Sequence, residues 1–367
     1  MQIAIRVDSS SRLGSGHVVR CLTLANELRG RGASVRFVSR EHEGNLIARI
    51  EAEGFEAIRL PGLRHDAMSA RVEDYAGWLG VSEERDAQQT LAGLHDAVDW
   101  LVVDQYALGA RWERLLRPVA TRILAVDDLA DREHDSDALL DQNYFGAAAS
   151  QRYRHLVGAS CVQLLGPRFA LVQPEYRWLR PLIPARVSVS RVLVFFGGSD
   201  LPNDTARVLE ALSCPELEHL AVDVVVGQNH PDPAAVRAWV DGRHGAAFHS
   251  GLATLAGLMA RADLAIGGGG STTWERASLA LPAVIVSLAD NQRQFSEALA
   301  ADGYQVLLGR NTEVTSDGWR RALLELIGDP QRLSLLSRRA ASLSDAEGSR
   351  RVVDFMLDPS AALPASN

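Results

Sequence analysis

The sequence contains no lysine, and all 38 of its basic residues are arginine. This absence excludes the chemistries that require a lysine amine, among them P-loop phosphate binding and Schiff-base catalysis on pyridoxal phosphate or aldol substrates. Long hydrophobic runs are missing too, because no uninterrupted apolar stretch approaches the roughly 18 residues that a membrane-spanning helix needs. We therefore expect no membrane partner.

Cysteine is rare in the sequence, and the net charge is negative. The three cysteines, Cys21, Cys161 and Cys214, are widely spaced and form no CxxC pair, so we interpret them as reduced packing residues, not as a disulfide frame or a zinc site. The net charge of −8 lacks the basic footprint of non-specific nucleic-acid binding. The chain opens with MQIAIRV, without the basic and apolar regions of a signal peptide, which predicts a cytoplasmic protein.

What the sequence does contain is a regular alternation of apolar strands and helical segments. Its 367 residues, 47% of them hydrophobic, suffice for two domains of about 150 residues each. In the first half, strands are expected at 3–7, 34–38, 55–60, 100–103, 122–126 and 138–140, separated by helices at 17–29, 46–53, 84–94 and 111–116. This alternation is typical of a parallel sheet wound by helices.

The second half repeats this layout after a proline-rich stretch at 166–184, which we interpret as a hinge. The segment 191–198, RVLVFFGG, is expected to be a strand that runs into a glycine-rich turn. Further strands are expected at 222–226 and 264–266, with helices at 204–212 and 252–260. The predicted fold is α/β: two Rossmann-like, doubly wound domains, residues 1–175 and 185–345, facing across a cleft, with a C-terminal helix and tail at 346–367. Ligands of such sheets bind at the carboxyl ends of the strands.

The first of these strand ends carries the segment RVDSSSRLGSGHVVR, residues 6–20. Gly14, Ser15 and Gly16 precede a helix whose free N–H groups would face an anion. The spacing is not GxGxxG, and no obvious acidic residue ends the second strand to bind a ribose, which disfavours a nicotinamide cofactor. His17 opens the helix, where the dipole favours a neutral ring able to act as a base, although a capping or packing histidine is the alternative. Asp8 could orient His17 or cap the loop, and it is also a candidate contact for the substrate.

Two further segments of the first half are polar. Asp104 and Tyr106 follow an apolar strand and should share a rim with His17, unless they are ordinary turn residues. The segment 126–137, VDDLADREHDSD, is crowded with carboxylates and contains His134. Its spacing matches no compact set of metal ligands, so a solvated acidic loop is favoured over a metal site.

The second half offers three more strand ends. FFGGSDLPNDT (195–205) and GGGGSTTWER (267–276) are glycine-rich turns that open helices, suited to phosphate or pyrophosphate, and the glutamate of the second turn could hold ribose hydroxyls. The amides of SLADNQRQF (287–295) suit the hydroxyl or acetamido groups of a sugar. The candidate residues are Ser199, Gly270, Ser271, Thr272, Glu275, Asn291 and Gln292.

Together these motifs resemble the UDP-sugar hydrolases of pseudaminic acid biosynthesis, a family with the glycosyltransferase-B (GT-B) superfold. The resemblance extends from residue 1 to about residue 357 and includes the stretches 166–176, 197–200 and 291–292. The family opening R-x-D-x-S…G-x-G-H-x-x-R is present as Arg6, Asp8, Ser10, Gly14, Gly16, His17 and Arg20. The insert at 64–84 and Trp274 are not features of the family pattern.

The resemblance implies an enzyme that removes UDP from UDP-2,4-diacetamido-2,4,6-trideoxy-β-L-altrose without a metal or a cofactor. His17 would activate water for attack at the anomeric carbon with inversion, and Tyr106 and Asn291 would line the sugar. Glu275 and the glycine-rich turn would hold UDP. The alternatives are a GT-B glycosyltransferase with a UDP-N-acetyl sugar donor, a UDP-sugar 2-epimerase, and a non-catalytic binder of a nucleotide sugar. The oligomeric state is not indicated.

Overall fold

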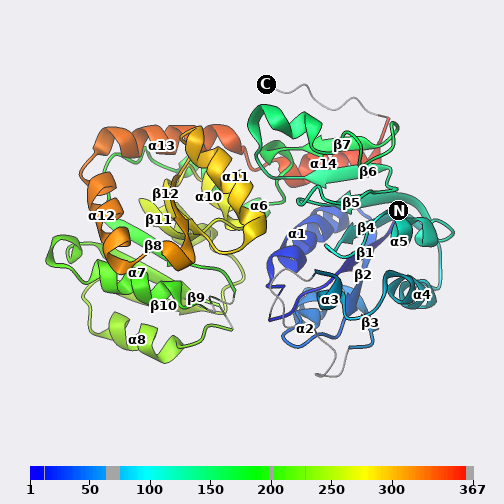
Figure 1. Ribbon diagram of the computed structural model, residues 1–367, viewed down its shortest axis with the longest axis horizontal. Helices are drawn as coiled ribbons and strands as arrows, with labels where there is room; N and C mark the ends of the chain where they lie inside the picture. The colour runs from blue at the N-terminus through cyan, green and yellow to red at the C-terminus, as the bar shows by residue number, and fades with distance from the viewer. Residues whose placement is uncertain (12, 63–74, 199, 201, 228, 361–367) are drawn as a thin grey trace. The chain divides into compact units, whose positions relative to one another are not determined.

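The computed structural model describes residues 1–11, 13–62, 75–198, 200, 202–227 and 229–360 (Figure 1). The chain divides into two compact units. The first unit contains residues 1–143, 147–171 and the C-terminal segment from Gly348, and the second contains 144–146 and 172–347. Each unit is an α/β sandwich built on its own parallel sheet.

The sheet of the first unit has seven strands within the described residues, all parallel, in the order β3-β2-β1-β4-β5-β6-β7. The order reverses between β1 and β4, and ligands of open α/β sheets bind at such a switch point. The strands are β1 (Gln2–Val7), β2 (Ser34–Arg40), β3 (Glu56–Leu60), β4 (Val98–Asp104), β5 (Ala120–Val126), β6 (Ala138–Asp141) and β7 (Val162–Leu165).

The central strands of this sheet are buried on both faces because helices cover both. Ile3 and Ile5 of β1 pack in one apolar cluster, whereas Ala4, between them, packs in another on the opposite face. The helices are α1 (Gly16–Gly30), α2 (Ile47–Ala52), α3 (Tyr75–Leu79), α4 (Glu83–Gly93), α5 (Ala110–Leu116) and α14 (Gly348–Leu357). The last of these returns to the first unit, where Trp100 Nε1 donates to the carbonyl of Met356 at 2.9 Å.

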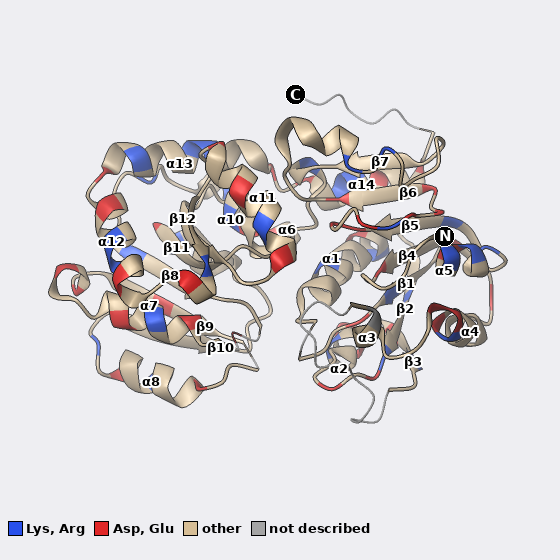
Figure 2. Cartoon of the chain, viewed as in Figure 1, with Lys and Arg blue, Asp and Glu red and all other residues tan. Residues whose placement is uncertain are grey.

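Local sequence explains where several helices begin. Ser82 caps α4 by accepting a hydrogen bond from the N–H of Arg85 at 3.2 Å. Acidic residues fill the first turn of that helix (Figure 2), where they complement the positive end of its dipole. By contrast, Ser15 precedes α1 without a side-chain capping bond.

The second unit has six parallel strands among its described residues, in the order β10-β9-β8-β11-β12-β13, with a switch point between β8 and β11. They are β8 (Arg191–Phe195), β9 (Ala221–Val226), β10 (Ala246–Ser250), β11 (Leu264–Gly268), β12 (Ala283–Ser287) and β13 (Val306–Arg310). The helices are α6 (Pro174–Leu179), α7 (Asp204–Leu212), α8 (Pro233–Asp241), α9 (Ala256–Arg261), α10 (Thr272–Ser278), α11 (Asp290–Ala301), α12 (Ser316–Ile327) and α13 (Pro330–Leu343).

The α/β fold class of two doubly wound sheets is therefore confirmed. The strands predicted at 3–7 and 34–38 form, the strand expected within 191–198 forms as β8, and the helix predicted at 204–212 has those bounds. The elements that were not predicted are β7, β10, β13, α3, α6, α8, α11, α12 and α13. In the described part of the chain, no helix is both long and apolar enough to span a membrane.

Candidate functional site

The first candidate site lies at the switch point of the first sheet. β1 ends at Val7, which is paired in register with Asp104 at the end of β4. The loop after β1 leads into α1, and His17 is the second residue of that helix. This topology brings His17 and Asp104 together although 87 residues separate them in sequence.

The His17 ring is held by the Asp104 carboxylate. Nδ1 of His17 lies 2.5 Å from Oδ1 of Asp104. Because an ionised carboxylate can only accept, Nδ1 carries the hydrogen in this contact, and the neutral ring then has its lone pair on Nε2. Among the described residues no hydrogen bond involves Nε2, and the His17 side chain is 12% exposed. The ring is thus oriented to accept a proton at Nε2.

Arg20, one helical turn after His17, completes the arrangement. Its Nε and Nη2 donate to the two oxygens of Asp104, each at 2.7 Å. Burial alone would raise the pKa of Asp104, but the charge of Arg20 and the contact with His17 outweigh burial and hold that pKa well below its usual range. Asp104 is therefore a permanent anion that Arg20 neutralises, and it can stabilise a positive charge that forms on His17.

Tyr106 packs against the other side of His17. Their ring centroids are 4.6 Å apart with an interplanar angle of 87°, an edge-to-face contact. Burial, with the negative charge of Asp128 beside it, raises the pKa of Tyr106 well above its ordinary value, so its phenol stays neutral. Asp128 also accepts from Nη1 of Arg20 at 3.1 Å. His17, Arg20, Asp104, Tyr106 and Asp128 form one connected group.

The glycine-rich loop before α1 turns tightly. Gly14 has φ of +76°, a conformation that favours glycine, and its N–H donates to the carbonyl of Ser10 at 2.9 Å. Ser15 directly precedes α1. The predicted role of Gly14, Ser15 and Gly16 in holding an anion at the start of this helix stays a prediction.

Asp8 does not orient His17, although the sequence left that option open. Its buried carboxylate accepts from Arg6 Nη1 at 2.6 Å, from the backbone N–H of Arg40 at 2.7 Å and from Gln105 Nε2 at 3.1 Å. Burial would raise its pKa, but the charge of Arg6 outweighs burial and lowers that pKa to about 2. Asp8 ties β1, β2 and the end of β4 together beneath the site. Its predicted contact with substrate stays a prediction.

The four glycines at 267–270, two at the end of β11 and two after it, have different roles. A Cβ atom on Gly267 would lie 2.0 Å from the carbonyl oxygen of Phe195, and one on Gly269 would lie 2.5 Å from Oγ of Ser296. These glycines are needed for close packing within the unit. A Cβ on Gly270 would meet only Nε2 of Gln292, at 3.6 Å. Of the glycines at 267, 269 and 270, Gly270 is therefore the one beside which a ligand has room, and the predicted pyrophosphate cradle stays a prediction.

The residues after Gly270 belong to short α10. Ser271 is exposed and Thr272 half-buried, and Glu275 is close enough to the buried Tyr176 for its charge, after burial, to raise the pKa of that phenol. Asn291 and Gln292 lie in the first turn of α11, after β12. The structure thus gathers Gly270 and Gln292, both predicted from the sequence, in one region of the second unit. Their ligand roles stay predictions.

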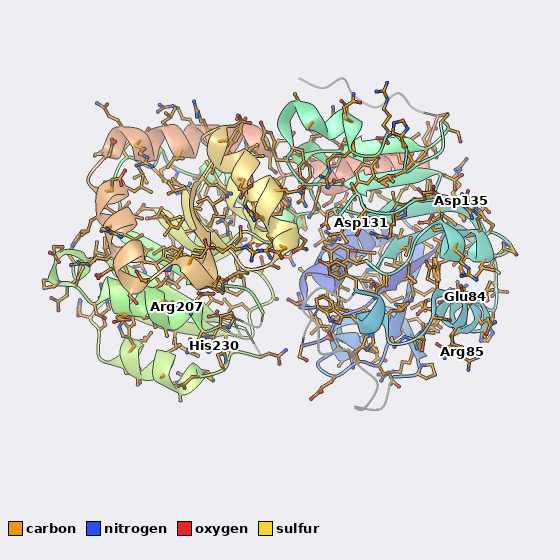
Figure 3. All side chains as sticks on the ribbon, viewed as in Figure 1. Glu84, Arg85, Asp131, Asp135, Arg207 and His230 are labelled. Atoms are coloured by element: carbon orange, nitrogen blue, oxygen red, sulfur yellow. The ribbon has the colours of Figure 1, made fainter. Side chains whose placement is uncertain are left out.

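The other glycine-rich turn, after β8, is organised differently. Ser199, the predicted phosphate donor there, lies outside the described residues. The carboxylate of Asp200 accepts from the backbone N–H groups of Asp204 and Thr205 at 2.8 and 2.9 Å, so it already occupies amides at the start of α7. His230, labelled in Figure 3, lies in the loop after β9. Its Nε2 is 3.5 Å from Oδ2 of Asp200.

The acidic segment 126–137 is not the solvated loop that the sequence favoured. Asp127 and His134 are buried, and Nδ1 of His134 lies 2.7 Å from Oε1 of Glu113. Asp131 is exposed and Asp135 half-buried (both labelled in Figure 3). Within the described residues, no group of three or more His, Cys, Asp or Glu side chains is placed to hold a metal ion. Asp127 pairs with Arg132 and His134 with Glu113, and composition alone does not reveal these pairings.

The sequence singled out His17, Asp104 and Tyr106, and the structure brings all three together. It assigned no role to Arg20 or Asp128. The three-residue spacing from His17 to Arg20 places both on one helix face, which was the available signal for Arg20. Asp128 follows β5, and only the order of the strands brings it to the site.

Comparison with known proteins gives relatives at low identity. No protein-family model matches the chain. An uncharacterized protein of Methanocaldococcus jannaschii is 22% identical over 80% of this chain, and the match spans 57% of that protein's length. The spore coat polysaccharide biosynthesis protein SpsG of Bacillus subtilis is 24% identical over 98% of both chains. The UDP-2,4-diacetamido-2,4,6-trideoxy-β-L-altropyranose hydrolase of Campylobacter jejuni is 22% identical over 83% of this chain and 98% of its own.

Solved structures resemble this chain in fold over nearly its whole length, although their sequence identity to it is low. MurG of Acinetobacter baumannii superposes with a TM-score of 0.62 over 97% of this chain and 99% of its own, at 16% identity. UGT2 of Phytolacca americana, solved with UDP-2-fluoro-glucose and pterostilbene, gives a TM-score of 0.66 over 96% of each chain at 13% identity. These likenesses and the two parallel sheets define the class: the chain has the GT-B fold.

Proposed function

We propose that this protein hydrolyses the anomeric C–O bond of UDP-2,4-diacetamido-2,4,6-trideoxy-β-L-altrose, releasing UDP and the free sugar. The observation that carries the proposal is the 2.5 Å contact between His17 Nδ1 and Asp104, which leaves Nε2 of His17 able to accept a proton. The Campylobacter jejuni relative named as this hydrolase supports the choice of substrate.

In this mechanism Nε2 of His17 removes a proton from water as the water oxygen attacks C1 of the sugar. The C1–O bond breaks on the opposite face, UDP leaves with the bonding electron pair, and the configuration at C1 inverts. Asp104 stabilises the imidazolium that forms, and Arg20 holds Asp104 in place. UDP is a good leaving group, so no carboxylic acid is needed to protonate it, unlike in ordinary glycosidases.

The second unit is assigned the nucleotide. Gly270, Ser271 and Thr272 would contact the diphosphate, Glu275 the ribose, and Gln292 lies next to Gly270. A UDP-sugar ligand is also consistent with the Phytolacca americana structure, which was solved with UDP-2-fluoro-glucose. No step in the mechanism requires a lysine, and the sequence has none.

The test is UDP release from this substrate by the purified protein without an added acceptor, compared between two variants. His17→Gln should abolish turnover while UDP still binds. His95→Gln, which alters an exposed histidine of the same unit, is the matched control and should behave as wild type. Turnover that survives in His17→Gln would overturn the mechanism. UDP release that begins only when an acceptor is added would indicate a glycosyltransferase, and UDP-sugar binding without release in any assay would indicate a binding protein.

A further inference from the structure

A row of aromatic rings extends the site away from His17. Tyr106 contacts His17 edge-on, Tyr75 lies 4.8 Å from Tyr106 between ring centroids, and Trp78 lies 5.2 Å from Tyr75. Tyr75 and Trp78 belong to α3, within the insert that the sequence analysis could not place in the family pattern. The catalytic proposal gives this row no role beyond Tyr106.

The position of α3 is fixed by its buried end. Leu79 is 1% exposed and packs in an apolar core cluster of the first unit, whereas Tyr75 and Trp78 are half-buried. Two large aromatic side chains thus remain partly accessible in the row of rings that begins at His17. The indole Nε1 of Trp78 is buried and has no hydrogen-bond acceptor among the described residues. A donor of this kind is costly to leave unpaired, and a ligand carbonyl would satisfy it.

The chemistry of the row fits the less polar parts of a sugar. Aromatic rings offer large apolar area with little conformational entropy to lose, and they suit methyl groups and C–H faces. A 2,4-diacetamido-6-deoxy sugar carries three methyl groups, two on its acetamido groups and one at C6. A sugar with a hydroxyl on C6 would place that hydroxyl against the carbon faces of the rings, and those faces offer it no hydrogen-bond partner.

We propose that Tyr75 and Trp78 form an aromatic wall, continuous with Tyr106, that selects N-acetylated 6-deoxy sugars for attack at the carbon next to His17. The inference rests on the proposed function and goes further by naming the residues that set the sugar class. Discrimination by an apolar pocket against an added hydroxyl is about tenfold to 100-fold, which is the selectivity expected of the wall.

The binding test uses the His17→Gln protein, so that the nucleotide sugar persists during the measurement. Saturation-transfer NMR is recorded with UDP-2,4-diacetamido-2,4,6-trideoxy-altrose. Saturation should reach the sugar methyl protons as well as the uracil. Adding Tyr75→Leu or Trp78→Leu should weaken the methyl signals and leave the uracil signal unchanged. Trp178→Leu, which removes an exposed tryptophan of the second unit, is the control and should change neither signal.

The kinetic test compares this substrate with its 6-hydroxy analogue in the otherwise wild-type protein. Tyr75→Leu and Trp78→Leu should raise KM for the 6-deoxy substrate and reduce its preference over the analogue by about tenfold or more, with kcat changing much less. Tyr75→Phe keeps the ring and should keep the preference.

Absence of saturation transfer to the methyl groups in the His17→Gln protein overturns the wall, and that result does not depend on whether the leucine variants fold. Folded leucine variants with unchanged selectivity overturn it as well. Methyl saturation that depends on Tyr75 or Trp78, in a protein whose wild type releases no UDP, would keep the wall and overturn the hydrolase proposal. The two proposals can therefore fail separately.

Discussion

Replacing Asp104 by asparagine changes the site at a single atom. The carboxylate now accepts from His17 Nδ1 and from Nε and Nη2 of Arg20, using both oxygens. An asparagine has one acceptor oxygen and one NH₂ group that can only donate. If the NH₂ faces His17, Nδ1 must accept and Nε2 must carry the hydrogen, so the ring can no longer take a proton from water. If the NH₂ faces Arg20, two donors oppose each other in a buried site.

The expected loss follows from these two consequences. An inverted tautomer at a histidine base lowers kcat by about 10³- to 10⁴-fold, which corresponds to roughly 4–5.5 kcal/mol in the barrier. Removing the anion also leaves the buried Arg20 with Asp128 as its remaining ion-pair partner. We expect this to lower the free energy of unfolding by about 3 kcal/mol. Below its melting temperature the variant is mostly folded, so unfolding cannot account for a fall in kcat of this size.

The assay measures kcat for UDP release, Kd for UDP and Tm on Asp104→Asn and on a matched control, Asp86→Asn. Asp86 is also buried and accepts from Arg6, Arg40 and Trp112, but it does not contact His17. The control should lose stability comparably and keep kcat near the wild-type value. The reasoning is refuted if Asp104→Asn retains kcat within tenfold of wild type, or if Asp86→Asn loses as much activity.

Three further predictions concern the scaffold. Gly267→Ala should lower the free energy of unfolding by about 1–3 kcal/mol, because its Cβ would lie 2.0 Å from the carbonyl oxygen of Phe195. Gly270→Ala, the control, should leave Tm unchanged. Equal Tm values for the two variants would contradict the prediction. Burial, then the charge of a nearby carboxylate, raises the pKa of Asp141 from 3.8 to about 7. Between these two pH values the folded state keeps a proton that the unfolded chain has released. The free energy of unfolding, measured by chemical denaturation, should therefore fall from about pH 4 to about pH 7, by up to about 1.4 kcal/mol per pH unit for this group. Asp141→Asn should remove that slope. Arg186→Met should cost about 3 kcal/mol in the same assay, since the Arg186 guanidinium donates to three backbone carbonyls; a loss below 1 kcal/mol would show that water replaces it.

Much of the fold could be predicted because parallel strands are apolar on both faces. Ile3–Ile5 and Val192–Val194 are short, continuous apolar runs, a serine-rich or glycine-rich loop begins a few residues after each, and both runs form central strands. β10, with the sequence AAFHS, is half-buried at a sheet edge and carries no such run. The return of α14 to the first unit depends on contacts such as that of Trp100 with Met356, across more than 250 residues, which local pattern does not encode.

The candidate site was predictable in its residue types and not in its pairings. His17 stood out because it opens a helix after a glycine-rich loop, and Asp104 because it ends a strand. Which carboxylate orients the ring depends on strand order: β1 lies between β2 and β4, so Asp8 meets the backbone of Arg40 and Asp104 meets His17. The buried state of His134 likewise depends on Glu113 from another element. Such pairings arise from topology.

The most direct test of the central claim is the fate of the oxygen atom in ¹⁸O-labelled water. The protein is incubated with UDP-2,4-diacetamido-2,4,6-trideoxy-altrose, with EDTA present, and both products are analysed by mass spectrometry. Attack by water at the anomeric carbon, with His17 as base, predicts label in the free sugar and unlabelled UDP. Label in a phosphate group of UDP would mean attack at phosphorus and would contradict the role assigned to His17.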